Sequence, residues 1–189
     1  MVSAAVQEVD LEFCKEVSDA DLALLAALGA KCHGAKLTSL NLNALHKLSD
    51  AAIVRAATAH GASLHALQLY WHHALASSAI VDVAKGCPHL TLLNLSGCQQ
   101  LEDSGVRAVA RSCGGSLASL DLTRCPLLTD DALVFMAPRL PNLKSLNCYA
   151  DSQFSDVAYV ALAQLHRLTF LDLCGATKLS ADVRRVWGL

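Results

Sequence analysis

One short pattern recurs along almost the whole chain of 189 residues and limits what the chain can fold into. The pattern is Leu-x-x-Leu-x-Leu, with occasional apolar replacements, and successive copies start 25 to 31 residues apart. The seven copies start near residues 6, 37, 64, 90, 117, 143 and 168. A repeat of this length buries its leucines only by stacking against its neighbours. We therefore expect one repeat domain over residues 1–189.

A second signal follows each leucine pattern at a fixed distance. In five repeats, an aspartate beside a serine or threonine stands ten residues after the fourth position of the pattern: Asp19, Asp50, Asp103, Asp130 and Asp156. Such residues begin helices, because their oxygens accept free backbone N–H groups and their charge suits the positive end of the helix dipole. Ser77 and Ala181 hold this place in the other two repeats. Each repeat therefore predicts a short strand, a turn and one helix.

The leucine patterns place the strands near residues 8–12, 39–43, 66–70, 92–96, 119–123, 145–149 and 170–174. Alternate side chains of a strand face opposite sides, so the paired leucines point inward and the residues between and after them point outward. Stacked units of this kind predict an α/β solenoid of about seven repeats, with parallel strands on the concave side and helices on the convex side.

The composition is strongly apolar, which raises the question of a membrane span. Hydrophobic residues make up 53% of the chain and the mean hydropathy is +0.38. The longest apolar run, Leu22 to Ala30, is nevertheless far shorter than the roughly 20 residues that a spanning helix needs. The formal net charge of −2 and the lack of a basic block argue against binding to nucleic acid or to an anionic membrane. No secretory signal is visible, so we expect the eight cysteines to be reduced thiols.

The cysteines follow the repeat as well. Cys14, Cys98 and Cys125 share one turn position after the leucine pattern, and Cys32, Cys87 and Cys113 share the end of the helix. With the Leu-Thr-Asp-x-x-Leu segment at residues 128–133, these positions resemble the leucine-rich repeat family in its cysteine-containing subtype. The resemblance implies a horseshoe-shaped arc. Four repeats depart from the subtype at the turn cysteine, and the third departs most, so we expect an irregular turn there. The four departures are Leu45, His72, Asp151 and Ala176.

Nothing in the pattern indicates catalysis or a bound cofactor. We expect the six repeat cysteines to be small buried groups, with Cys148 in place of an inward leucine and Cys174 facing outward. No Cys-x-x-Cys pair occurs, and two stacked thiols do not make a four-ligand zinc site. His72 and His73 point apart as neighbours in a turn, and we interpret them as ordinary turn residues. No Ser-His-Asp arrangement, nucleophile elbow or phosphate-binding glycine loop is present. We therefore expect no catalytic, metal or cofactor site and no small-molecule substrate.

The outward positions of the strands are where this architecture would bind a partner. Most are polar, as an exposed sheet face must be, but Tyr70, Trp71 and Tyr149 are aromatic and typical of binding anchors. Packing against the third turn explains Trp71 equally well. The candidate partner-binding residues on the concave face are Asn41, Asn43, Gln68, Tyr70, Trp71, Asn94, Ser96, Asp121, Thr123, Arg124, Asn147 and Tyr149.

The resemblance implies two non-catalytic functions, both with other proteins as partners. The first is recognition of a substrate protein, as in F-box/LRR ubiquitin-ligase receptors. Because the first repeat begins by Val6, we expect no F-box ahead of it in this sequence. The second is a structural scaffold in a large assembly such as the axonemal nexin–dynein regulatory complex, and apolar ends of the array favour it. Either function implies a cytoplasmic protein, with the ciliary axoneme or the nucleus as alternatives.

Overall fold

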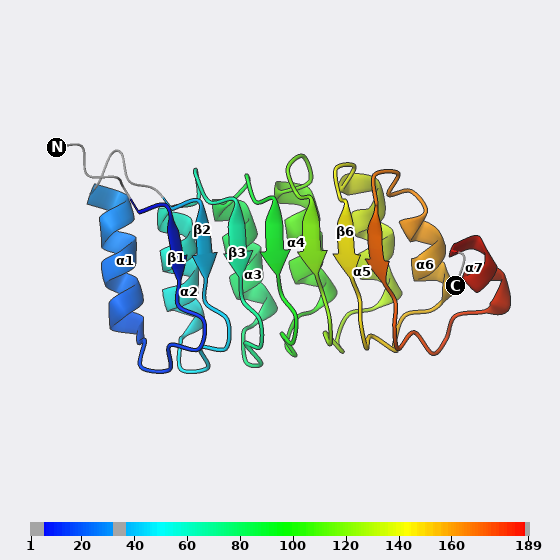
Figure 1. The fold of residues 1–189 in the computed structure, drawn as a ribbon, viewed down its shortest axis with the longest axis horizontal. Coiled ribbons are helices and arrows are strands. Elements are labelled where there is room, and N and C mark those ends of the chain that lie inside the picture. Colours follow the sequence, from blue (N-terminus) through cyan, green and yellow to red (C-terminus); the bar gives the residue numbers. More distant parts are fainter. Residues whose placement is uncertain (1–5, 32–36, 188–189) are drawn as a thin grey trace.

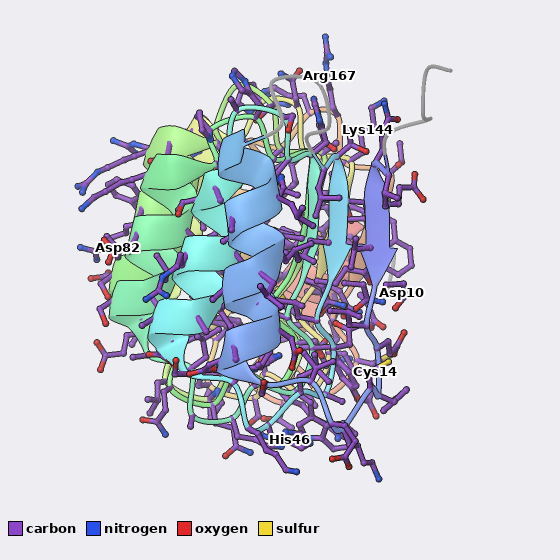
Figure 2. All side chains as sticks on the ribbon, turned by 90° about the vertical axis from the view of Figure 1, so that its left-hand side faces the viewer. Asp10, Cys14, His46, Asp82, Lys144 and Arg167 are labelled. Carbon is purple, nitrogen blue, oxygen red and sulfur yellow. The ribbon has the colours of Figure 1, made fainter. Side chains whose placement is uncertain are left out.

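The computed structural model describes residues 6–31 and 37–187, which form two layers. Figure 1 shows the seven strands side by side in sequence order, with the helices behind them, and Figure 2 shows the helix layer on one side and the sheet on the other. The strands are β1 (Glu8–Asp10), β2 (Ser39–Asn41), β3 (Ala66–Gln68), β4 (Leu92–Asn94), β5 (Ser119–Asp121), β6 (Ser145–Asn147) and β7 (Phe170–Asp172). The helices are α1 (Asp19–Lys31), α2 (Asp50–Ala59), α3 (Ser77–Gly86), α4 (Asp103–Ser112), α5 (Asp130–Met136), the 3-10 helix η1 (Ala137–Arg139), α6 (Asp156–Leu162) and α7 (Ala181–Trp187).

The sheet is parallel throughout, and its register follows the leucine pattern. The fourth residue of each pattern pairs with the fourth residue of the next, from Val9 through Leu40 and Leu67 to Leu171. Each strand is three residues long, two fewer than we predicted at its C-terminal end. A turn follows each strand directly, and in six repeats a polar side chain between the paired leucines closes it by bonding the backbone just beyond, as described below.

The core lies between the sheet and the helices and is made of stacked columns. The paired leucines of the inner repeats, such as Leu93 and Leu95, are at most 1% exposed, and small helix residues such as Ala56 and Ala84 pack against them. Large side chains are few because the neighbouring repeats approach closely. Gly61, for example, lies so near the carbonyl group of Gly86 that an added Cβ would overlap it.

The helices begin at the predicted residues, and the aspartates have a further role. Ser49, Thr129 and Ser155 cap the helices that follow them by accepting a backbone N–H group. The first aspartate of a helix bonds the capping residue of the next repeat. Asp103, for instance, accepts from the N–H and the hydroxyl of Thr129 at 2.8 and 2.6 Å. Asp19 bonds Ser49 in the same way at 2.9 and 2.6 Å, so this bond joins one repeat to the next.

The turn cysteines form a column of hydrogen-bond donors. The Sγ atoms of Cys98 and Cys125 lie 3.5 and 3.3 Å from the carbonyl oxygens of Leu69 and Leu95 in the preceding repeat. In the third repeat, His72 Nε2 makes the equivalent bond to the Leu42 carbonyl oxygen at 2.8 Å. Burial lowers the pKa of His72, and the neutral ring donates from Nε2. The expectation of an irregular third turn was therefore wrong, because the histidine supplies the donor that the cysteine supplies elsewhere.

Two further positions depart from what we expected of this column. Cys14 is exposed rather than buried, because no repeat among the described residues packs on the outer side of its own. Cys32, which we predicted at the end of a helix, lies outside the described residues.

In the sixth repeat the turn column holds Asp151, which is fully buried. Its Oδ1 atom accepts from the Cys125 N–H at 2.9 Å, and its Oδ2 atom has no partner among the described residues. Burial raises the pKa of Asp151 to about 7.

No helix among the described residues is both long enough and apolar enough to cross a bilayer.

Candidate functional site

The polar residues between the paired leucines, which we predicted to contact a partner, first serve the fold. In six repeats the Oδ1 atom of this residue accepts from the backbone N–H group two residues later, at 2.9 to 3.0 Å: Asp10, Asn41, Asn94, Asp121, Asn147 and Asp172. This hydrogen bond closes a turn at the end of each strand. The second polar atom of Asn41, Asp121 and Asn147 is bonded as well, because Asn41 Nδ2 donates to Glu12 and Asn147 Nδ2 donates to Asp121 at 3.3 Å, so these side chains offer little to a partner.

The third repeat is again different. Gln68 is one methylene longer and does not close the turn, and Asn43 of the preceding repeat accepts from the Tyr70 N–H group at 2.8 Å instead. This bond holds Asn43 beneath the third repeat, where it is 5% exposed. Predicting Asn43 as a partner-binding residue was therefore wrong.

Two other predicted residues are also buried. Asn41 is 6% exposed, because its amide group reaches sideways to the Glu12 carboxylate at 3.2 Å. Ser96 is 5% exposed, and in the register of the sheet it lies between Tyr70 and Thr123, which are both larger. These two residues offer little surface to a partner, contrary to our prediction.

The structure brings four aromatic side chains together where β2 and β3 turn toward their helices. We call His46, Tyr70, Trp71 and His73 the aromatic cluster. The ring centroids of Tyr70 and Trp71 are 5.0 Å apart, those of Trp71 and His73 5.8 Å, and those of His73 and His46 5.8 Å in a stacked arrangement. A hollow of about 210 Å³ adjoins the two histidines. Figure 2 places His46 at the opposite end of the strands from Lys144 and Arg167, so the cluster lies at one end of the sheet face.

Trp71 has an unusual backbone conformation. Its φ angle is +65°, in the left-handed region that costs most residues about 1 kcal/mol relative to glycine. The fourth and seventh repeats have Gly97 and Gly175 at the same turn position. The indole ring lies against Gly97, where an added Cβ would contact it at 3.3 Å, and yet Trp71 remains 39% exposed. One part of the Trp71 side chain therefore packs against the next repeat, and the rest is exposed and could contact a partner.

A second aromatic group lies two repeats further along. The Arg124 guanidinium carbon is 5.9 Å from the centroid of the Tyr149 ring, which is 41% exposed. Arg124 occupies the same turn position as Trp71, and Gly97 stands between them in the intervening repeat.

The charge of this face comes mainly from carboxylates. Asp10, Asp121 and Asp172 lie in the polar column, and Arg124 is the only cation among the predicted site residues. The hydrogen bond to Asp172 raises the pKa of the exposed Cys174 thiol, and burial raises the pKa of Cys98 to about 12. Within residues 6–31 and 37–187, no three His, Cys, Asp or Glu side chains are placed to hold a metal ion. The arrangement can make aromatic, hydrogen-bond and ionic contacts.

From the sequence we named Tyr70, Trp71, Arg124 and Tyr149 as candidates and did not name His46 and His73, which lie beside Tyr70 and Trp71 in the structure. The signal was available, because the register places residue 46 of one repeat beside residue 73 of the next. We interpreted His73 as an isolated turn residue, and the contact becomes visible only when the repeats are stacked.

Comparisons with known proteins agree with this architecture. A family model described as a leucine-rich repeat matches residues 86–110. The chain is also similar to one chain in the crystal structure of the Rad7 and Elc1 complex in yeast, with a TM-score of 0.76 and 23% sequence identity. That likeness covers 90% of this chain and 43% of the other, so the present chain spans less than half the length of its relative. The fold of this chain is a leucine-rich repeat solenoid, as its repeat pattern predicted.

Proposed function

We propose that this chain is a protein-interaction module that binds a partner protein through the aromatic cluster and the Arg124–Tyr149 pair. The observation that carries the proposal is Trp71. A large aromatic side chain stands there at a left-handed turn position where the other inner repeats have alanine, glycine or arginine, and 39% of it is exposed. Tryptophan, tyrosine and arginine are the residues most enriched at interface positions that dominate binding energy.

A finer proposal follows from the repeat subtype. The cysteine column resembles the substrate-recognition repeats of F-box/LRR ubiquitin-ligase receptors, and we propose that the chain recognises a substrate protein in the same general way. The Rad7–Elc1 structure, in which a similar chain forms part of a protein complex, supports an interaction role. Since the seven described cysteines are free thiols, we also infer a reducing compartment such as the cytoplasm.

A structural subunit of a large assembly is the second candidate. It is favoured by apolar side chains exposed on the two outermost repeats, Phe13 at 59% and Phe170 at 52%. A partner in such an assembly would cover these side chains at the ends of the array. A substrate protein recognised as in the ligase receptors would cover the aromatic cluster instead.

The test compares the proteins that the wild-type chain and its variants capture from an extract of the source cells. Trp71→Ala removes the anchor and leaves a residue that the fold accepts, because Ala44 and Ala150 occupy the same left-handed turn position. Val157→Ala/Val160→Ala is the matched control, since both valines are exposed on α6, away from the sheet face. Loss of an anchor of this kind weakens binding by about 2 kcal/mol, or about thirtyfold.

We expect a defined set of proteins to be retained by the wild type and by the valine variant and to be lost from Trp71→Ala. Cullin and Skp-type adaptor subunits in that set would support the ligase proposal. Phe13→Ser and Phe170→Ser address the scaffold proposal in the same experiment. If Trp71→Ala retains every partner of the wild type, the aromatic cluster is not the binding site.

A further inference from the structure

The helix face carries a concentration of positive charge that the proposed sheet-face site does not use. Phe135, on α5, has three guanidinium groups around its ring. The carbon atoms of these groups lie 5.5 Å (Arg107), 5.0 Å (Arg111) and 3.9 Å (Arg139) from the ring centroid. Arg107 and Arg111 stand one turn apart on α4, and Arg139 comes from η1. Two neighbouring repeats thus bring three cations to one aromatic ring, which attracts each of them weakly.

Few of the hydrogen-bond donors of these arginines are used within the protein. Arg107 forms an exposed ion pair with Asp131 at 3.3 Å, and its Nε atom is buried without a partner among the described residues. Arg139 donates to the carbonyl oxygen of Phe135 at 2.9 Å. Arg111 makes no hydrogen bond or ion pair with any residue that the structure describes. Each guanidinium has five N–H donors, so most of them are free to bind another molecule.

The surface is hollowed on both sides of Arg111. One hollow, of about 620 Å³, lies between α3 and α4 and is lined by Lys85, Arg107, Arg111 and the hydroxyl-bearing Ser104 and Ser112. The other, of about 480 Å³, is lined by Arg111 and Arg139.

One carboxylate also lines the first hollow, and it is already engaged. Asp103 accepts two hydrogen bonds from Thr129 at its far side, as described above. The two hollows share Arg111, and four cations but only one carboxylate line them.

We propose that Lys85, Arg107, Arg111 and Arg139, which we call the arginine cluster, bind an acidic peptide segment of a partner protein. Three guanidinium groups held near one another repel, and carboxylates relieve that repulsion while accepting paired hydrogen bonds from the guanidinium fork. A segment with several Asp or Glu side chains supplies such groups at the spacing of successive residues, which suits the row of cations from α3 to η1.

The extent of the charge favours a peptide over nucleic acid or a membrane. The cluster is confined to three neighbouring repeats, and Asp82 on α3 and Asp131 on α5 border it. Figure 2 shows Asp82 on the outer side of the helix layer, opposite the sheet face with Asp10. A polyanion or a charged bilayer requires a wider basic surface, and this chain has a net charge of −2. The cluster stands on the opposite face from the aromatic cluster, so this inference does not depend on the function proposed above.

A nuclear magnetic resonance titration of the isotope-labelled full chain with a short polyglutamate peptide at low salt tests the proposal. We expect amide shifts confined to α3, α4, α5 and η1. Arg111→Gln/Arg139→Gln should weaken binding about tenfold, since two exposed charge pairs are lost. Lys144→Gln/Arg167→Gln removes the same net charge from two exposed residues elsewhere and should leave the affinity unchanged.

The fold of each variant is checked by its thermal unfolding. Arg111→Lys/Arg139→Lys keeps both positive charges but removes the paired N–H donors of the guanidinium groups, so it should lose only part of the affinity. This variant still tests the proposal if the glutamine variant does not fold. Equal weakening in both glutamine variants, or shifts spread over the whole surface, would overturn the proposal. So would tighter binding of duplex DNA or of vesicles containing phosphatidylserine than of polyglutamate, because the cluster would then serve another class of partner.

Discussion

The buried carboxyl group of Asp151 predicts an unusual dependence of stability on pH. This residue occupies a turn position where other repeats have a cysteine or histidine that donates a hydrogen bond, and only one of its two oxygens is bonded. An ionised carboxylate is poorly solvated there, so burial raises its pKa to about 7 from the value of about 3.9 that an unfolded chain gives. Asp151→Asn keeps the acceptor for the Cys125 N–H group and cannot ionise.

The sign of the effect follows from the two pKa values. Because the pKa is raised on folding, the folded state favours the neutral carboxyl group. The stabilisation from this group is complete below about pH 4 and is lost progressively as the pH rises through about 7. A shift of about three pKa units corresponds to about 4 kcal/mol between these limits, which is a large part of the stability of an ordinary domain.

The assay is urea unfolding, followed by circular dichroism, of the wild type and of Asp151→Asn between about pH 4 and pH 8. We expect similar free energies of unfolding at the acidic end and a gain for the variant that grows to about 4 kcal/mol at the alkaline end. Asp131→Asn, at an exposed site, is the control for loss of one negative charge. A difference between Asp151→Asn and the wild type that stays constant with pH would refute the assigned ionisation.

Three further predictions concern the joints between repeats and the accessibility of the thiols. Gly61→Ala should lower the free energy of unfolding by about 1 to 3 kcal/mol, because the added Cβ overlaps the backbone of the next repeat. Gly115→Ala, with open space around it, should be neutral, and chemical denaturation of both variants measures the difference. Asp103→Ala should cost about 1 to 2 kcal/mol by the same measurement because it removes the bonds to the next helix cap, and an unchanged midpoint would contradict this. Among the described cysteines, a thiol reagent should modify the exposed Cys14 and Cys174 first and the buried ones only on unfolding. Mass spectrometry follows the modification, and simultaneous modification of all of them would show that the buried thiols are accessible in the folded chain.

The parts of the fold that repeat were predictable from the sequence because each position was sampled seven times. The helices begin at Asp19, Asp50 and the corresponding later residues as predicted, and the paired leucines fill the core. The length of the strands was not predictable from alternation alone. Each strand ends at the turn that follows it, and β3 ends at the same register although Gln68, unlike Asn94, does not close that turn with a side-chain bond.

The candidate sites were predictable only in part because they depend on contacts between repeats. A strand position that points outward can still be buried by its neighbours, as Asn43 and Ser96 are. The arginine cluster was missed for a related reason. Arg107 and Arg139 are far apart in sequence, and they meet at Phe135 only because α4 packs against α5.

Residues that break the repeat are therefore of two kinds, and the hydrogen bonds separate them. His72 breaks the cysteine column but makes the same donor bond, so the fold explains it fully. Trp71 is different, because its large ring is 39% exposed and forms no bond that the turn needs. The left-handed backbone does not set Trp71 apart, since Phe13, Ala44, Arg124 and Ala150 share it, but the exposed part of its ring has no stabilising gain within the fold. Contact with a partner supplies such a gain, because burying the remaining surface of an indole ring releases more free energy than the backbone conformation costs.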